Sequence, residues 1–262
     1  EPNAAIFSKS DLTIFGEGEL TVNANYNDGI SSKDGFLIKS GTINVNAKDD
    51  GIRGKDFLVI RDVNITINAG GDGLKSDYEY GFILFEAGTV NISAGDDGMH
   101  AESYITINDA TISITNSVEG IESASITVNS GNINIVSSDD GFNATAGSGG
   151  EENDGSCLNI YGGVIVVNSS VGDGLDSNGN ITITAGKIIV HGPQQQPEVG
   201  MDYNGTCNIT GGLLIISGTN SNNTQAPGTS STQYSLKLIT TSSNAAGELF
   251  HIQDSNGNEI IT

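Results

Sequence analysis

One short motif, repeated along the chain, constrains the fold of this protein more than any other feature. An acidic residue, a glycine and an apolar residue follow one another seven times, and a degenerate eighth copy reads Val199-Gly200-Met201. The seven copies begin at Asp28, Asp50, Asp72, Asp97, Glu119, Asp140 and Asp173. Successive glycines lie 21 to 26 residues apart, with one gap of 33. A near-constant period of this length predicts a repeat architecture in which like residues stack in columns.

Residues 42–69 show how one repeat is expected to fold. Residues 42–47 alternate apolar and polar side chains as a half-buried strand does, residues 57–60 predict a second strand, and residues 63–69 alternate again. Turns are expected at Asp50-Gly51 and Arg61-Asp62. With no helical period anywhere, we predict an all-β, right-handed parallel β-helix with one coil per repeat. The inward, core-forming residues are expected to be Ile43, Val45, Ile65, Ile67, Val90, Ile92, Ile112, Ile114, Ile133 and Ile135.

The repeat region and the tail are expected to form one domain. We predict β-helix coils over residues 1–217 and a C-terminal cap over residues 218–262, because an open coil end exposes strand edges. The cap is expected to end in a hairpin of residues 249–253 and 259–261. The gap of 33 holds a glycine-rich and acidic insertion at residues 145–156, which we interpret as a mobile loop or a ligand flap.

Composition narrows the choice of partners. The chain has 32 acidic against 10 basic residues and a formal net charge of −22, which argues against nucleic acid and anionic membranes and favours cations. No apolar stretch is long enough to span a bilayer. The two cysteines, Cys157 and Cys207, fall about two coils apart, roughly 10 Å, so we predict free, buried thiols. We expect a monomer.

The acids fall into columns beside the motif glycine. Alternation points the residues two and four positions after the glycine outward, beside the column of acids that precede it. Carboxylates stacked about 4.8 Å apart repel one another, so they require bound Ca²⁺, salt bridges to Arg or Lys, or raised pKa values. The simpler alternative, that Asp-Gly is only turn chemistry, explains the glycines but leaves the outward acids unexplained.

Calcium suits the coils in which acids outnumber bases, because Ca²⁺ takes six to eight oxygen ligands. We therefore predict several Ca²⁺ ions in three groups of residues. The groups are Asp72, Asp77, Asp96, Asp97 and Glu102; then Glu119, Glu122, Asp139 and Asp140; and finally Asp173, Asp176 and Asp202. The three histidines lie far apart in the sequence, which argues against a zinc site.

Three segments carry a resemblance to known proteins. Asp49-Asp50-Gly51-Ile52, Asp139-Asp140-Gly141-Phe142-Asn143 and Asp173-Gly174-Leu175-Asp176 resemble the calcium motif of family 9 pectate lyases, which are right-handed parallel β-helices. The repeat region resembles more closely a family of secreted bacterial carbohydrate-binding proteins with a polysaccharide-lyase-like β-helix. That resemblance implies an extracellular, secreted or cell-surface protein that binds calcium and plant-wall polysaccharide, namely pectic polygalacturonate and cellulose. The final acid of the lyase motif is Asn143 here, and no motif places the lyase's catalytic lysine.

Three functions follow as hypotheses. The first is calcium-dependent binding of polygalacturonate or other plant-wall polysaccharide, with Ca²⁺ bridging protein and sugar carboxylates. The second is pectate-lyase-type β-elimination, which needs Ca²⁺ and a base. The third is a calcium-stabilised structural stalk or adhesin. Candidate substrate-binding residues are Arg53, Lys75, His100, Tyr78, Tyr80 and Tyr104. Candidate catalytic residues are Lys75, as the base, with Arg53 and His100 in the same column, although charge neutralisation of the neighbouring acids is the simpler reading of all three.

Overall fold

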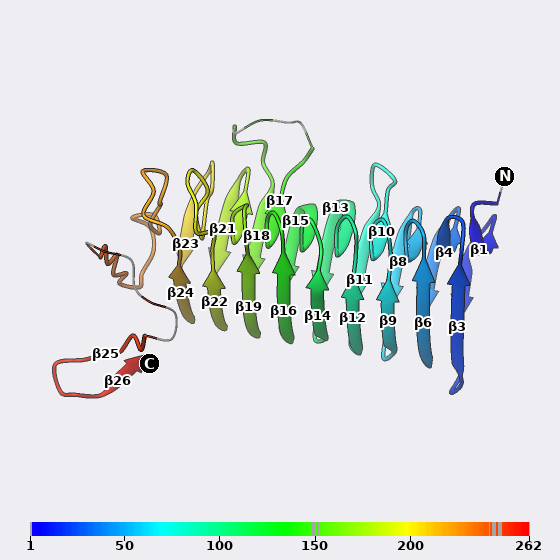
Figure 1. The fold of residues 1–262 in the computed structure, drawn as a ribbon, viewed down its shortest axis with the longest axis horizontal. Helices are drawn as coiled ribbons and strands as arrows, with labels where there is room; N and C mark the ends of the chain where they lie inside the picture. Colours follow the sequence, from blue (N-terminus) through cyan, green and yellow to red (C-terminus); the bar gives the residue numbers. More distant parts are fainter. Residues whose placement is uncertain are drawn as a thin grey trace.

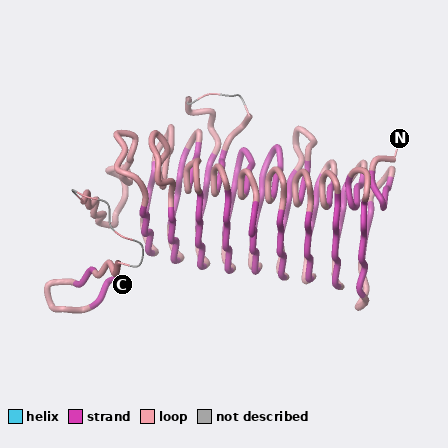
Figure 2. Tube along the Cα trace, viewed as in Figure 1, coloured by secondary structure: helices cyan, strands magenta, loops and turns pink. Residues whose placement is uncertain are grey.

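The protein is a β-solenoid of about nine turns in which short parallel strands stack along one axis (Figure 1). The computed structural model describes residues 2–147, 150, 152–240, 242, 245 and 248–261, and over these residues it contains strands and turns but no helix. The predicted all-β parallel architecture is therefore confirmed. Figure 2 shows the same coils side by side along the long axis, with the N- and C-termini toward opposite ends of the molecule.

Each coil carries up to three strands, one for each face. The first face consists of β1 (Ala4–Ser8), β4 (Asp28–Ser32), β7 (Ile52–Gly54), β10 (Leu74–Ser76), β13 (Met99–Ile107), β15 (Ile121–Val128), β17 (Phe142–Ala144) and β20 (Leu175–Ser177). The second face consists of β2 (Leu12–Ile14), β5 (Gly35–Ile38), β8 (Phe57–Ile60), β11 (Phe82–Phe85), β18 (Cys157–Ile160), β21 (Asn180–Ile183) and β23 (Cys207–Ile209). The third face consists of β3 (Glu19–Ala24), β6 (Thr42–Ala47), β9 (Asn64–Asn68), β12 (Thr89–Ser93), β14 (Thr111–Asn116), β16 (Asn132–Ser137), β19 (Val164–Ser169), β22 (Lys187–His191) and β24 (Leu213–Ser217).

The strands β13 and β15 run uninterrupted through the corner between the first two faces. Each of them pairs with strands of both faces, so those faces form a single 15-stranded sheet. The third face is a separate nine-stranded sheet. On those two coils one strand continues from the first face to the second, with a register shift between Ala101 and Tyr104, whereas a turn separates the two faces on the coils beside them.

The core follows from strand alternation. In the third-face sheet Ile43 pairs with Ile65, and Val45 pairs with Ile67, so apolar side chains stack on like side chains from coil to coil. All ten residues predicted to face inward are buried, with at most 2% of their surface exposed. The sequence thus predicted the core correctly, because a residue period of two leaves only one face of each strand to bury.

The motif glycine is required by the close approach of successive coils. Its amide donates to the next coil, as Gly51 N does to Asp72 O at 2.8 Å. A Cβ atom on Gly51 would lie 2.6 Å from the carbonyl oxygen of Gly73 and 2.5 Å from a methyl carbon of Ile67. Any side chain at this position would force the coils apart, which explains why the glycine recurs in every copy of the motif.

The insertion and the tail depart from the regular coil. The insertion at residues 145–156 lies between β17 and β18, and its residues Ser148, Gly149 and Glu151 are outside the described part of the chain. After β24, Gly228 N donates to Cys207 O at 2.7 Å, so the tail hydrogen-bonds to the last coil. The predicted terminal hairpin is present as antiparallel β25 (Ile252–Gln253) and β26 (Glu259–Ile261). The division into coils and cap at residues 217 and 218 stays a prediction.

Both cysteines are free, as predicted, although only Cys207 is buried and Cys157 is half-buried. The difference arises from strand alternation, because Cys157 aligns with Asn180 and Cys207 with the neighbouring inward residue Ile181. Among the described residues no helix has the length and apolar character needed to cross a membrane.

Candidate cation-binding face

The acids that precede the motif glycines form a ladder along the first face. The carboxylate oxygen Oδ1 of Asp50 accepts the backbone amide of Asp72 at 3.1 Å, and Oδ1 of Asp72 accepts the amide of Asp97 at 3.0 Å. The same contact recurs from Asp97 to Glu119 and from Asp140 to Asp173. These acids therefore bind the next coil as well as forming turns, and Asp28, Asp50, Asp72, Asp97 and Asp173 are buried. Burying them in a column leaves negative charge that must be balanced.

Basic side chains balance the early coils. Lys75 Nζ lies 2.5 Å from Asp72 Oδ2 and 3.7 Å from Asp50 Oδ2. The guanidinium of Arg53 forms an ion pair with Asp77 and lies 3.9 Å from Asp28. Burial opposes the charge of Lys75, but Asp72 and Asp50 raise the pKa of its ammonium above the ordinary value. Lys75 is therefore held protonated, which favours charge neutralisation over the role of general base.

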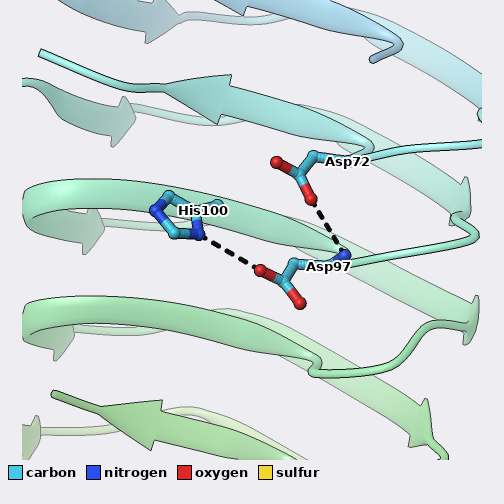
Figure 3. Close-up of side chains that lie close together, drawn as sticks. All are labelled: Asp72, Asp97 and His100. Carbon is cyan, nitrogen blue, oxygen red and sulfur yellow. Dashed lines mark hydrogen bonds and ion pairs between the residues drawn. The ribbon is translucent and has the colours of Figure 1, made fainter. Parts of the chain in front are cut away.

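His100 fills the same column on the next coil, between Lys75 and Glu122. Its Nδ1 lies 3.1 Å from Asp97 Oδ2, and Asp97 in turn bonds to Asp72 through its own amide (Figure 3). The other ring nitrogen, Nε2, lies 3.5 Å from Glu102. Burial works against an imidazolium, but the hydrogen bond with Asp97 and the charge of Glu122 raise the pKa of His100 above its ordinary value. These acidic neighbours favour the protonated form of His100, which places a basic side chain in this coil as in the two before it.

His100 also borders a group of acids, since its Nδ1 lies 3.1 Å from Asp97 Oδ2 and 3.9 Å from Glu122 Oε1. Carboxylate oxygens of Asp97, Glu119 and Glu122 lie within 4.8 Å of one another, a spacing that suits a shared metal ion. Burial and a contact with Glu119 raise the pKa of the Glu122 carboxyl. Asn143, which lies in register with Glu122 on the next coil, donates its side-chain amide to Glu119 Oε2 at 2.7 Å.

The last group of acids lines a pocket of about 400 Å³ between coils. Carboxylate oxygens of Asp173, Asp176 and Asp202 lie within 4.8 Å of one another there. The wall also contains Asp139, Asp140, Gly172, Pro197, Glu198, Val199 and Asn223. Burial, and then the charge of Asp176, raise the pKa of Asp140 to about 9. The pocket is thus a site of strongly negative potential, of a kind that a divalent cation would stabilise.

The structure regroups the predicted calcium ligands. Asp72 and Asp97 come together with His100, but Asp77 is paired with Arg53, Asp96 is exposed and Glu102 faces His100. Glu119 and Glu122 join Asp97, whereas Asp139 and Asp140 line the pocket of Asp173, Asp176 and Asp202. The groups combine the residue before the glycine with the residue two after it. The residue four after lies roughly 7 Å further along the strand.

Sequence reasoning missed one contributor to this face and one aromatic residue of the second face. Glu198 lines the pocket, and it stands two residues before Gly200, where other copies of the motif have Asp49, Asp96 and Asp139. The acids that recur two residues before the motif glycine could therefore have identified Glu198 from the sequence. Phe57 was also missed; its ring stacks on Phe82, which stacks on Tyr104, whereas Tyr78 and Tyr80 form an edge-to-face pair at 5.9 Å.

Comparison with known proteins places the chain in a family. A 47-residue segment, 18% of this chain, is 51% identical to a carbohydrate-binding domain-containing protein of Acetivibrio thermocellus, and the match spans 16% of that relative's length. No solved structure matches the chain. The sequence model of a family described as "Carbohydrate-binding domain-containing protein" matches residues 1–156, more than half of the chain. The protein therefore belongs to this carbohydrate-binding domain-containing family.

Proposed function

We propose that this protein binds acidic plant cell-wall polysaccharide, such as polygalacturonate, outside the cell, through several Ca²⁺ ions held on the first face of the solenoid. The family to which it belongs supports carbohydrate binding as the general function. The observation that carries the finer proposal is the series of acid groups with metal-ligand spacing, which ends in the pocket of Asp173, Asp176 and Asp202. Cellulose is a further ligand to test.

The chemistry of the donors fits calcium. Three carboxylates supply part of the six to eight oxygens that Ca²⁺ takes, so a bound ion would retain positions for water and for sugar carboxylates. A protein of net charge −22 repels a polyuronate unless cations lie between the two. Bridging Ca²⁺ therefore supplies both the attraction and the dependence on calcium.

The groups differ in how well they suit Ca²⁺. Asp173, Asp176 and Asp202 lie in a pocket whose other charged wall residues are also acids, which makes this pocket the expected site of tightest binding. Asp97, Glu119 and Glu122 share their coil boundary with His100, 3.9 Å from Glu122, and should bind more weakly. Asp72 is already paired with Lys75 and should contribute least.

The β-elimination hypothesis is less favoured, because Lys75, its candidate base, is ion-paired with two acids. The stalk hypothesis differs from the proposal only in having no sugar partner. One set of assays separates the three functions. Soluble polygalacturonate with excess Ca²⁺ is followed by ultraviolet absorbance for unsaturated uronide, and retention of the protein on immobilised polygalacturonate and on cellulose is then measured.

The decisive comparison is retention with Ca²⁺ against retention with EDTA. We expect retention of the wild type with Ca²⁺, its loss with EDTA, and its loss in the double variant Asp173→Asn and Asp176→Asn. Asp109→Asn is the matched control, because Asp109 is an exposed acid outside the motif. Retention that EDTA leaves unchanged would contradict the calcium proposal, and absence of retention on every glycan would leave the stalk.

A further inference from the structure

The aromatic residues of the second face form a ladder that stops abruptly. Phe57, Phe82 and Tyr104 occupy one column on β8, β11 and β13, in register from coil to coil. The ring centroids of Phe57 and Phe82 are 5.6 Å apart at 20°, and those of Phe82 and Tyr104 are 4.7 Å apart at 6°. The three rings are therefore nearly parallel and lie face to face along the solenoid axis.

The two ends of the ladder differ. The first end is closed, because the ring of Phe57 lies over Gly35, whose missing Cβ would meet the Phe57 Cζ atom at 2.0 Å. At the other end the column continues with Ser125 and then Cys157, whose side chains are short and contact each other at 3.3 Å. Neither supplies a ring to continue the stack, so the aromatic column ends at Tyr104, of which 38% is exposed.

We infer that the face of Tyr104 that points away from Phe82 is a stacking platform for one pyranose ring of the bound glycan, an inference that rests on the proposed function. Tyrosine offers a flat apolar ring with a polar rim, and the C–H face of a pyranose is complementary to such a ring. A sugar placed there takes the next position in the ladder, where the protein supplies no ring of its own. Phe57 and Phe82 hold Tyr104 in place beneath it.

The surroundings of Tyr104 fit a sugar chain. Tyr104 lies on β13, which, like its neighbour β15 in the next coil, passes from the first face to the second without a turn; the register between the two strands shifts between Ala101 and Tyr104. Glu102 precedes Tyr104 on the same strand, and His100 lies four residues away, roughly 13 Å along the strand. A polyuronate lying along β13 can therefore stack on Tyr104 and extend toward the acid group of Asp97, Glu119 and Glu122.

The test separates this platform from the calcium sites. Retention on immobilised polygalacturonate at saturating Ca²⁺ is measured for the wild type, Tyr104→Ala, Tyr104→Phe and Tyr161→Ala. Tyr161 is a matched control, because it is exposed to a similar extent, 44%, and lies outside the ladder. We expect about tenfold weaker binding for Tyr104→Ala, because an aromatic stack contributes on this scale, and wild-type binding for the other two variants.

Two further measurements fix the interpretation. Calcium affinity, measured by calorimetry without glycan, should be unchanged in Tyr104→Ala, and its melting curve shows whether the variant folds. If Tyr104→Ala folds and binds glycan like the wild type, the platform is excluded while the proposed function stands. If the wild type itself is not retained on any glycan, the proposed function fails and the platform fails with it. If Tyr104→Phe also loses binding, the ring face is not the contact.

Discussion

The early coils, which contain Arg53, Lys75 and His100, and the late coils around Asp176 balance the charge of their stacked acids in different ways. Both stack buried acids before the motif glycine, yet the early coils place Arg53, Lys75 and His100 two residues after it, and a late coil places Asp176 there. The early acids are neutralised by the chain itself, whereas the late acids line a pocket with Glu198 and Asp202. Under the proposed function, the residue two positions after the motif glycine decides whether a coil neutralises its own acids or takes an outside cation.

Removal of calcium should produce the largest effect on stability. If the late pocket binds Ca²⁺, saturating ion at about 100 times its Kd stabilises the fold by about 2.7 kcal/mol, which corresponds to a Tm shift of about 5–10 °C for a chain of this size. We expect EDTA to lower Tm by that amount and Ca²⁺ in excess to restore it. Differential scanning calorimetry measures the shift, and an unchanged Tm would show that the late coils need no ion.

The substitution Asp176→Lys tests whether the column itself sets the difference. Asp176 lies in register with Asn143, Glu122, His100 and, through them, with Lys75, so a lysine there imitates an early coil. We expect this variant to be more stable than the wild type in EDTA, and to gain less than half as much Tm as the wild type on addition of Ca²⁺, because the ammonium replaces the ion. Asp176→Asn, which removes charge without adding any, should lie between the two.

Stability without calcium should fall as pH rises. The pKa of Asp140 is raised to about 9 by burial and by Asp176, so from about pH 4 to pH 9 the folded state binds more protons than the unfolded state does. In that window the calcium-free protein therefore loses stability with increasing pH. Ca²⁺ binding expels those protons, so its affinity should increase by up to about tenfold per pH unit for each proton released. Urea unfolding in EDTA at pH 5, 6.5 and 8 measures the stability, and calorimetric Ca²⁺ titrations at the same pH values measure the affinity. A pH-independent affinity would contradict the charge assignment.

Loss of an internal cation should destabilise the early coils. Lys75→Met retains most of the side-chain volume but leaves Asp50 and Asp72 without their ammonium, at a cost of about 1–3 kcal/mol, since the pair is partly exposed. Urea unfolding in EDTA measures the change. Added Ca²⁺ should restore part of the lost stability in this variant by occupying the position of the ammonium group. If Ca²⁺ restores none of it, an ion cannot replace the basic side chain in an early coil.

The solenoid could be predicted from the sequence because the strands and turns of each coil are determined by residues close together in the chain. Ile43 and Ile65 could be assigned to the core from the alternation of apolar and polar residues alone. The position of each motif glycine in its coil could be assigned from the repeat period. Side-chain groupings were harder, because they depend on which carboxylate reaches which neighbour. Asp77 was predicted as a calcium ligand, but Arg53 on the preceding coil pairs with it. The stacking of Phe57 on Phe82 depends on the register between β8 and β11, which could not be read from the sequence.

The smallest effect on the free energy of unfolding is expected outside the acidic face, where the loss of an exposed ion pair changes stability little. Arg61 Nε lies 3.1 Å from Glu86 Oε2, a distance comparable to the contacts of the early coils, but both side chains are more than 40% exposed. Water and salt screen such a pair, so Arg61→Ala should change the free energy of unfolding by less than about 1 kcal/mol and leave the response to Ca²⁺ intact. Urea unfolding beside Lys75→Met measures the contrast. An equal loss in the two variants would show that burial in the acid column adds nothing to the early ion pairs, and the distinction between self-neutralised and ion-dependent coils would then have no energetic basis.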